Sequence, residues 1–120
     1  MLDVFDETPV TNIQVFNNEQ FGSIRTTGTA DEPLFCAADI CRALGYTNGR
    51  KAIADHCDEG DVIKIYITTT GGVQRMNFLT EPGLYILLLR SRLDKAAKFK
   101  NWVIRDVLPS IRRTRRYSLN

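Results

Sequence analysis

The segment VIKIYITTTGGVQRMNFLT (residues 62–80) alternates apolar and polar residues on both sides of a glycine pair. Alternation of this kind is typical of a half-buried strand, and two such runs around a glycine turn predict a β-hairpin. A turn at Gly71 and Gly72 would place Ile67 opposite Met76 and leave one face of the hairpin apolar. Arg75 would then lie on the other face.

Short strand candidates precede this hairpin in the chain. Residues 13–16 and 20–27 alternate in the same way, and Asn17 and Asn18 between them are residues that tolerate the positive φ values of a tight turn. A third short strand is expected at residues 34–36. The N-terminal half therefore predicts a second antiparallel unit.

Helical periodicity follows the third strand. Apolar residues recur at helical spacing over residues 37–44, and Gly45 is a typical C-terminal stop. A second short helix over residues 48–56 can begin at either Thr47 or Asn48, since both are good N-caps. Two short helices around a glycine-containing turn predict a helix-turn-helix-like pair.

Two more helices follow the hairpin. Thr80 can cap the first, which tolerates Pro82 in its first turn. Asp94 can cap a longer second helix, and Pro109 is expected to end or bend it. The predicted fold is α+β: small antiparallel hairpins packed with four or five short helices.

Length and composition indicate one ordinary domain. The chain has 120 residues, of which 43% are hydrophobic and 25% charged, a balance that supports a packed core rather than disorder. We expect an irregular lead-in at residues 1–11, the domain at residues 12–114, and a basic tail or start of a linker at residues 115–120. No apolar run approaches membrane-spanning length, no signal pattern opens the chain, and three cysteines fit a reducing cytoplasm.

Metal binding and catalysis find no support in the sequence. Four residues separate Cys36 from Cys41, whereas a zinc pair usually has two between its cysteines, and His56 and Cys57 are adjacent on one predicted helix. Buried free thiols are the simpler interpretation. No nucleophile–base pair, phosphate loop or cofactor motif is present, so we expect neither an enzyme, nor a metal site, nor a cofactor.

Charge is distributed unevenly along the chain. Eleven acidic residues face four basic ones between residues 1 and 61, whereas ten basic residues face two acidic ones between residues 90 and 116, although the net charge is only +2. A cationic segment with few internal partners favours contact with phosphates. The phosphate-contact candidates are Arg90, Arg92, Lys95, Lys98, Arg105, Arg112, Arg113, Arg115 and Arg116.

The helix-turn-helix-like pair adds candidates for contacts inside a DNA groove. The second helix of such a pair presents its N-terminal residues to the base edges. Here those residues are Asn48, Arg50 and Lys51, and Arg75 could add a contact from the hairpin, whose non-core face also carries Lys64.

Four longer motifs resemble the N-terminal domain of the Bro family, which occurs in phage and prophage antirepressors and in baculovirus repeated-ORF proteins. They are LFCAADI at residues 34–40, ALGYTNGRKAIADH at residues 43–56, EPGLY at residues 81–85 and FKNWVIRDVLPSIR at residues 99–112. Leu34 and Pro82 depart from the residues that are commonest in the family.

The resemblance implies a double-stranded DNA-binding domain of an antirepressor-type regulator, encoded by a phage or prophage and located in the bacterial cytoplasm. An alternative of a different class stays open: antirepressors can act by binding a repressor protein, and the domain would then be a protein-interaction module. The sequence leaves the formation of homo-oligomers open as well.

Overall fold

Five strands and a set of helices alternate along the chain. The computed structural model describes residues 8–91 and 94–118. Its elements are β1 (Gln14–Asn18), β2 (Gly22–Gly28), β3 (Pro33–Cys36), α1 (Ala37–Ala43), α2 (Gly49–His56), η1 (Glu59–Asp61), β4 (Val62–Thr69), β5 (Gly72–Leu79), α3 (Glu81–Arg90), α4 (Lys95–Trp102), the π-helical η2 (Val103–Val107) and α5 (Leu108–Ser118). The α+β prediction is confirmed.

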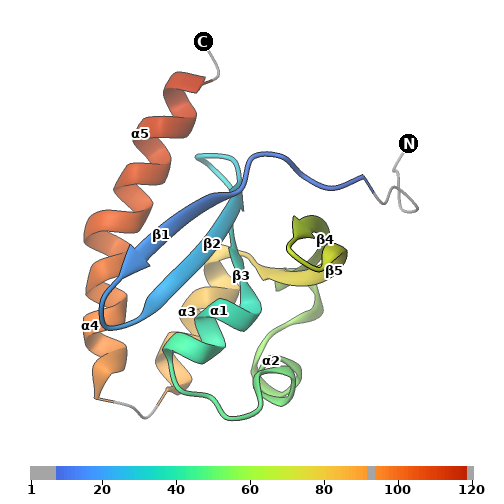
Figure 1. Ribbon diagram of the computed structural model, residues 1–120. Coiled ribbons are helices and arrows are strands. Elements are labelled where there is room, and N and C mark those ends of the chain that lie inside the picture. Colours follow the sequence, from blue (N-terminus) through green and yellow to red (C-terminus); the bar gives the residue numbers. More distant parts are fainter. Residues whose placement is uncertain (1–7, 92–93, 119–120) are drawn as a thin grey trace.

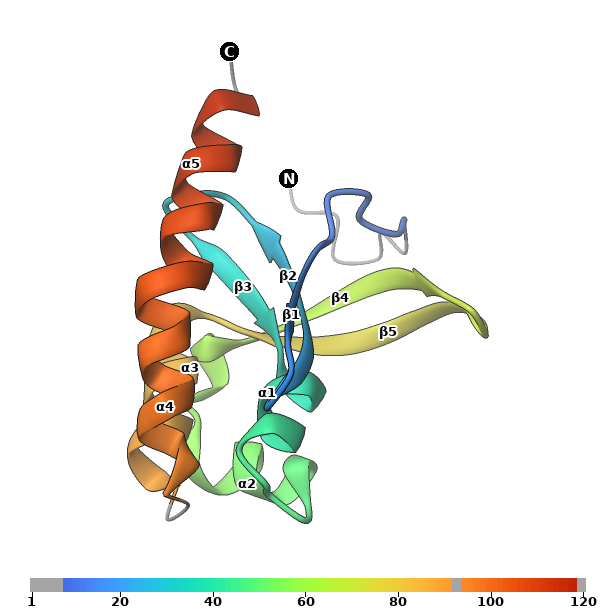
Figure 2. The ribbon, with the colours of Figure 1, turned by 60° about the vertical axis from the view of Figure 1, so that its left-hand side comes forward.

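The strands form a single antiparallel sheet in the order β1-β2-β3-β5-β4. The short β3 joins the two predicted hairpins, because Phe35 pairs with Leu79. In Figure 2 the β4–β5 ribbon extends away from the rest of the sheet, on the side opposite to α4 and α5. The sheet thus links a compact body to a projecting two-stranded arm.

Apolar side chains cover the sheet on both faces. The larger cluster joins Ile24, Phe35 and Leu79 of the sheet to buried residues of α1, α3 and the C-terminal helices, among them Ile40, Leu84, Phe99, Val103 and Ile111. The smaller cluster lies on the opposite face around Cys36, Ile67 and Phe78, with Val10 and Ile13 packed against it.

The register of the β4–β5 hairpin differs from the prediction by two residues. Ile67 lies opposite Gln74, and Met76 pairs with Ile65. The last pair is Thr69 with Gly72, so the turn residues are Thr70 and Gly71. Gly72 takes the positive φ of 102°, and the Thr69 hydroxyl accepts from the Gly71 N–H. A two-residue shift keeps every side chain on its predicted face, because strands have a period of two.

The turn between β1 and β2 lies at residues 19–21, two residues later in the chain than the predicted turn at Asn17 and Asn18. Asn17 and Asn18 belong to β1, and Asn18 pairs with Gly22 across a three-residue loop. Asn18 Oδ1 accepts hydrogen bonds from the backbone N–H groups of Gln20 and Phe21. Gly22, not an asparagine, supplies the positive φ, as is usual for a three-residue hairpin loop.

The predicted helix boundaries are confirmed for the first three helices. Asn48 and Thr80 accept the capping hydrogen bonds of α2 and α3. After α1, Gly45 has a φ of 78°, and the Tyr46 N–H donates to the Cys41 carbonyl while the Gly45 N–H donates to that of Arg42. This is a Schellman stop. Asp94 precedes α4 as expected but makes no capping side-chain bond.

Pro109 neither ends the C-terminal helix nor stands at its boundary. The helix runs on through η2 into α5, and the three form one rod (Figure 1). Proline lacks the N–H that an α-helix needs in its interior. Here a π-helical turn precedes it, in which hydrogen bonds span five residues and the normal pattern is already interrupted. Of the two outcomes predicted for Pro109, an end or a bend of the helix, the end is therefore wrong.

Candidate nucleic-acid interface

A groove lies between the α1–α2 helix pair and the β4–β5 ribbon, and it encloses a volume of about 1060 Å³. Its base is made of small side chains from α1, namely Ala37, Ala38 and Cys41. In Figure 2 α1 and α2 lie lower in the view than the projecting β4–β5 ribbon.

Close packing at the start of α2 positions this helix. A Cβ atom added to Gly49 would lie 3.1 Å from Cys41 Cβ, so glycine allows α2 to approach α1 closely. Arg50, Ile53 and Ala54 of α2 then line one wall of the groove.

Four basic side chains from four elements of the fold line the groove. They are Arg42 on α1, Arg50 on α2, Lys64 on β4 and Arg75 on β5. In the described part of the chain no Asp or Glu lines it. Gln74 and Asn77 add side-chain amides, and Lys64 Nζ donates to Asn77 Oδ1 over 3.3 Å. The groove therefore offers positive charge together with neutral hydrogen-bonding groups.

The structure brings together only some of the residues predicted to enter a DNA groove from the helix pair and the hairpin. Arg50 and Arg75 are exposed and both line the groove. Lys51 instead forms an exposed ion pair with Asp55 at 2.7 Å, which raises the pKa of Lys51 and lowers that of Asp55. Asn48 lies outside the groove lining and uses its Oδ1 to accept from the Lys51 N–H.

Asn48 should therefore behave as a helix cap. Asn48→Ala is expected to destabilise the fold by about 1 kcal/mol, because the backbone N–H of Lys51 loses its acceptor. Asn48→Ser keeps an acceptor, so its melting temperature should stay near that of the wild type, and its affinity for DNA should not change. A large loss of affinity in a stable Asn48→Ser variant would show instead that the amide contacts bases.

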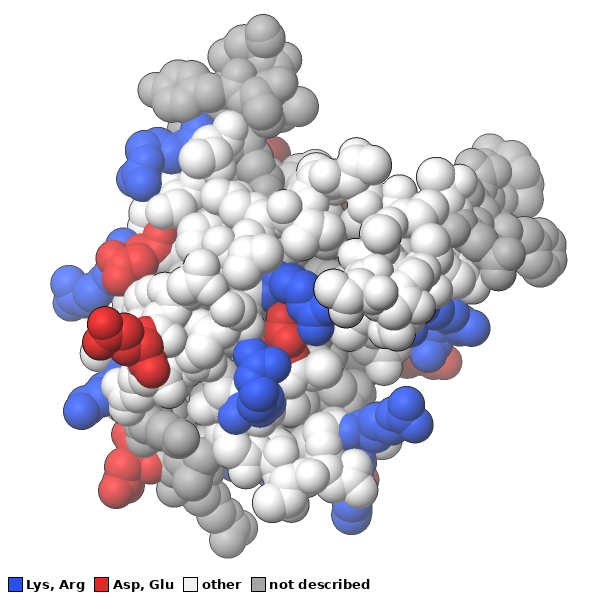
Figure 3. Space-filling view, viewed as in Figure 1, with Lys and Arg blue, Asp and Glu red and all other residues white. Residues whose placement is uncertain are grey.

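The basic residues predicted on the C-terminal helix form a separate group. Lys98, Arg105, Arg112 and Arg113 are exposed, and the long helix lies on the side of the domain opposite to the ribbon (Figures 1 and 2). Acidic side chains alternate with basic ones along this edge in Figure 3. Arg90 is exposed at the end of α3. Arg92 lies outside the described residues, as do the side chains of Lys95, Arg115 and Arg116.

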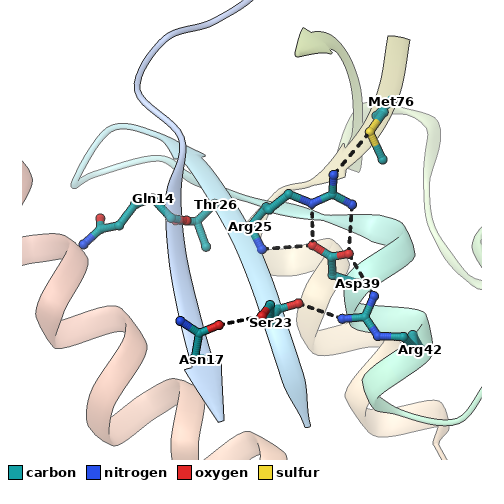
Figure 4. Close-up of polar contacts among 8 residues, drawn as sticks. All are labelled: Gln14, Asn17, Ser23, Arg25, Thr26, Asp39, Arg42 and Met76. Atoms are coloured by element: carbon teal, nitrogen blue, oxygen red, sulfur yellow. Dashed lines mark hydrogen bonds and ion pairs between the residues drawn. The ribbon is translucent and has the colours of Figure 1, made fainter. Parts of the chain in front are cut away.

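Arg42 was not among the predicted site residues, and a buried carboxylate explains its position. Figure 4 shows Asp39 between Arg25 of β2 and Arg42 of α1. The Arg25 backbone N–H and Nε donate to Asp39 Oδ2 at 3.0 and 2.9 Å, and Arg25 Nη2 donates to Oδ1 at 3.0 Å. Arg42 Nη1 donates to the same Oδ1 at 3.1 Å, and its Nη2 donates to the Ser23 carbonyl at 2.7 Å.

Asp39 is charged and almost completely enclosed. Its side chain is 3% exposed, whereas those of Arg25 and Arg42 are 30% and 56% exposed. Burial alone would raise the pKa of Asp39, but the hydrogen bonds from Arg25 outweigh this effect and lower it. A charged residue inside the apolar run FCAADI, with arginine three positions later, was the sequence signal for such a pair.

The three thiols are unreactive in character. Burial raises the pKa of Cys36 and Cys57, and it raises that of Cys41 to about 11. They are therefore protonated at neutral pH. Within residues 8–91 and 94–118, no group of three His, Cys, Asp or Glu side chains could hold a metal ion. None of the helices in this part of the chain has the length and hydropathy needed to cross a membrane.

Comparison with known proteins identifies the family. The model of the BRO family, N-terminal domain, matches residues 23–109. An uncharacterized protein of Haemophilus influenzae is 49% identical over 85 residues, which cover 71% of this chain and 42% of that protein. Bro-N domain-containing proteins 289L and 201R of Invertebrate iridescent virus 6 are 32% and 30% identical, over 80% and 89% of this chain and 27% and 30% of their own length.

The chain thus spans less than half the length of these relatives. No solved structure matches it significantly. Because the family model covers most of the chain, including the helix pair, the ribbon and Pro109, the chain belongs to the BRO family and contains its N-terminal domain.

Proposed function

We propose that this chain is a non-catalytic, double-stranded DNA-binding domain of an antirepressor-type transcriptional regulator, and that DNA lies against the groove between α1–α2 and the β4–β5 ribbon. The observation that carries the proposal is the charge of this groove. Arg42, Arg50, Lys64 and Arg75 line it, and no described acidic residue does. Several cations on one concave surface favour DNA as the ligand, because each can neutralise a backbone phosphate.

The two walls would make different contacts. Lys64 and Arg75 lie on the exposed face of a ribbon that projects from the body, so they can reach phosphates on either side of a DNA groove. Arg50 stands in the first turn of α2, the position from which a recognition helix contacts DNA. Gln74 and Asn77 carry the amide groups that can hydrogen-bond base edges. Phosphate contacts would supply most of the affinity.

The relatives bear on the origin of the chain. They include a bacterial protein and viral proteins named for the Bro-N domain. We accordingly propose a phage or prophage origin and a place of action in the bacterial cytoplasm.

Salt dependence tests DNA binding directly. We expect a fluorescein-labelled random duplex to bind at 50 mM salt, and its affinity to fall by roughly 100-fold between 50 and 200 mM if about four phosphates are contacted. Fluorescence anisotropy measures both values. Absence of binding at 50 mM, or an affinity that does not change with salt, would contradict the proposal.

Binding to a repressor protein is the second candidate. Leu89 at the end of α3 is 79% exposed, more than any other large hydrophobic residue in the described part of the chain. An exposed apolar residue of this kind suits a protein interface. Leu89→Asp should abolish repressor binding in that case and leave DNA binding unchanged.

A further inference from the structure

A second concavity adjoins the proposed DNA groove. It encloses about 460 Å³ and is lined by Val15, Gly22, Ser23, Arg25, Asp39 and Arg42. Arg42 lines this concavity and the groove alike. The two surfaces therefore meet at the Arg42 side chain.

The cations of this second concavity face outward, while the acid faces inward. Asp39 is 3% exposed, and its two oxygens accept four hydrogen bonds from Arg25 and Arg42. The side chains of Arg25 and Arg42 remain 30% and 56% exposed. An approaching anion thus meets two partly exposed arginine side chains and a carboxylate that is already fully hydrogen-bonded.

Arg42 also has N–H groups beyond those that hydrogen-bond to described residues. A guanidinium carries five N–H groups. Among the described residues, Arg42 donates one to Asp39 and one to the Ser23 carbonyl. Gly22 lies beside this guanidinium: a Cβ atom added to it would be 3.6 Å from Arg42 Nη2 and 3.9 Å from Nε. Hydrogen bonds on its inner side hold the group in place, which lowers the entropy that binding would cost.

We propose that the Arg25–Asp39–Arg42 cluster is a phosphate-binding site for the DNA backbone, next to the groove and continuous with it. This inference rests on the proposed function. The DNA backbone would run out of the groove past Arg42 and over the edge formed by β1 and β2. Asp39 is a positioning residue in this site: it holds the two arginines and does not touch the phosphate.

Val15 allows a test that spares the arginines. It is 48% exposed on the edge strand β1, pairs across the strands with Arg25, and lines only the second concavity. In the full chain, Val15→Lys should steepen the slope of log K against log salt by about 0.9 and tighten duplex binding roughly eightfold at 0.1 M salt. Val15→Glu should weaken binding several-fold, because its carboxylate would compete for Arg25.

Leu89 provides the matched control, since it is exposed and lines neither concavity. Leu89→Lys and Leu89→Glu change the net charge equally and should alter affinity less than twofold. Thermal melting of all four variants shows that each is folded. Equal effects at the two positions would overturn the second site and leave the groove proposal standing, whereas a wild-type chain that fails to bind DNA would overturn the groove proposal first.

Discussion

Replacing Arg50, Lys64 and Arg75 together with glutamine is expected to abolish most of the salt dependence of DNA binding. Each lost phosphate contact should reduce the slope of log K against log salt by about 0.9, so three should reduce it by about 2.7 and weaken binding roughly 500-fold at 0.1 M salt. All three side chains are exposed, and none forms an ion pair with a described residue. The fold should therefore tolerate their replacement.

A second triple variant provides the control for this experiment. Lys98, Arg105 and Arg112 are exposed on the long helix, and replacing them with glutamine removes the same number of charges. We expect a much smaller change in slope, because this helix lies on the opposite side of the domain. Salt titrations of both variants compare the two surfaces. A larger loss in the helix variant would move the interface from the groove to the C-terminal helix.

Asp39→Asn is expected to cause the largest loss of stability. The carboxylate joins β2 to α1 through Arg25 and Arg42, and a neutral amide cannot accept from both arginines equally well. Breaking a buried pair leaves uncompensated charge, which here should cost about 3 kcal/mol because the arginines are partly exposed. The melting temperature should fall by roughly 10–15 °C.

Asp55→Asn is the matched control, since its partner Lys51 and Asp55 itself are both exposed. An exposed pair of this spacing contributes only about 0.3–0.5 kcal/mol. Chemical denaturation of the two variants gives both free energies of unfolding. If the two substitutions had similar effects, Asp39 would not be the buried link between β2 and α1.

The pH dependence of the free energy of unfolding should include a contribution from the Asp39 carboxylate. The pKa of Asp39 is lowered in the folded chain, so as the pH falls the unfolded state takes up this proton first. The contribution of Asp39 is complete above the unfolded pKa of about 3.9 and is lost as the pH falls through the lower folded value. The stabilities of the wild type and Asp39→Asn should converge as the pH is lowered towards that range.

Local sequence patterns predicted most of the elements. Asn48 and Thr80 marked helix starts, Gly45 marked a helix stop, and alternation marked the strands of the hairpin. These signals work because each depends on a few neighbouring residues and their backbone preferences. The turns were predicted less accurately than the strands and helices. Gly71 and Gly72 are compatible with two strand registers that keep each side chain on the same face of the hairpin. Only the positive φ of Gly72 in the structure identifies the register that is adopted.

Pro109 shows where local preference gives way to packing. Alone, it predicts that the helix ends or bends there. Val103, Val107, Leu108 and Ile111 are all buried in the core on either side of it. Burying these side chains together favours one continuous helix, and the π-helical turn accommodates the proline.

The sequence by itself determined the fold class, the hairpin, the helix pair and the basic character of the C-terminal segment, since these depend on composition and on contacts between neighbours. Only the tertiary structure decided which cations share a surface. Arg42, Arg50, Lys64 and Arg75 come from separate elements, and no periodicity in the chain links them. Asp39 likewise finds Arg25 fourteen residues away, across the junction of β2 and α1. Such groupings follow from the packing of the sheet against the helices, because charges are brought together by the shape of the fold rather than by their spacing in the chain.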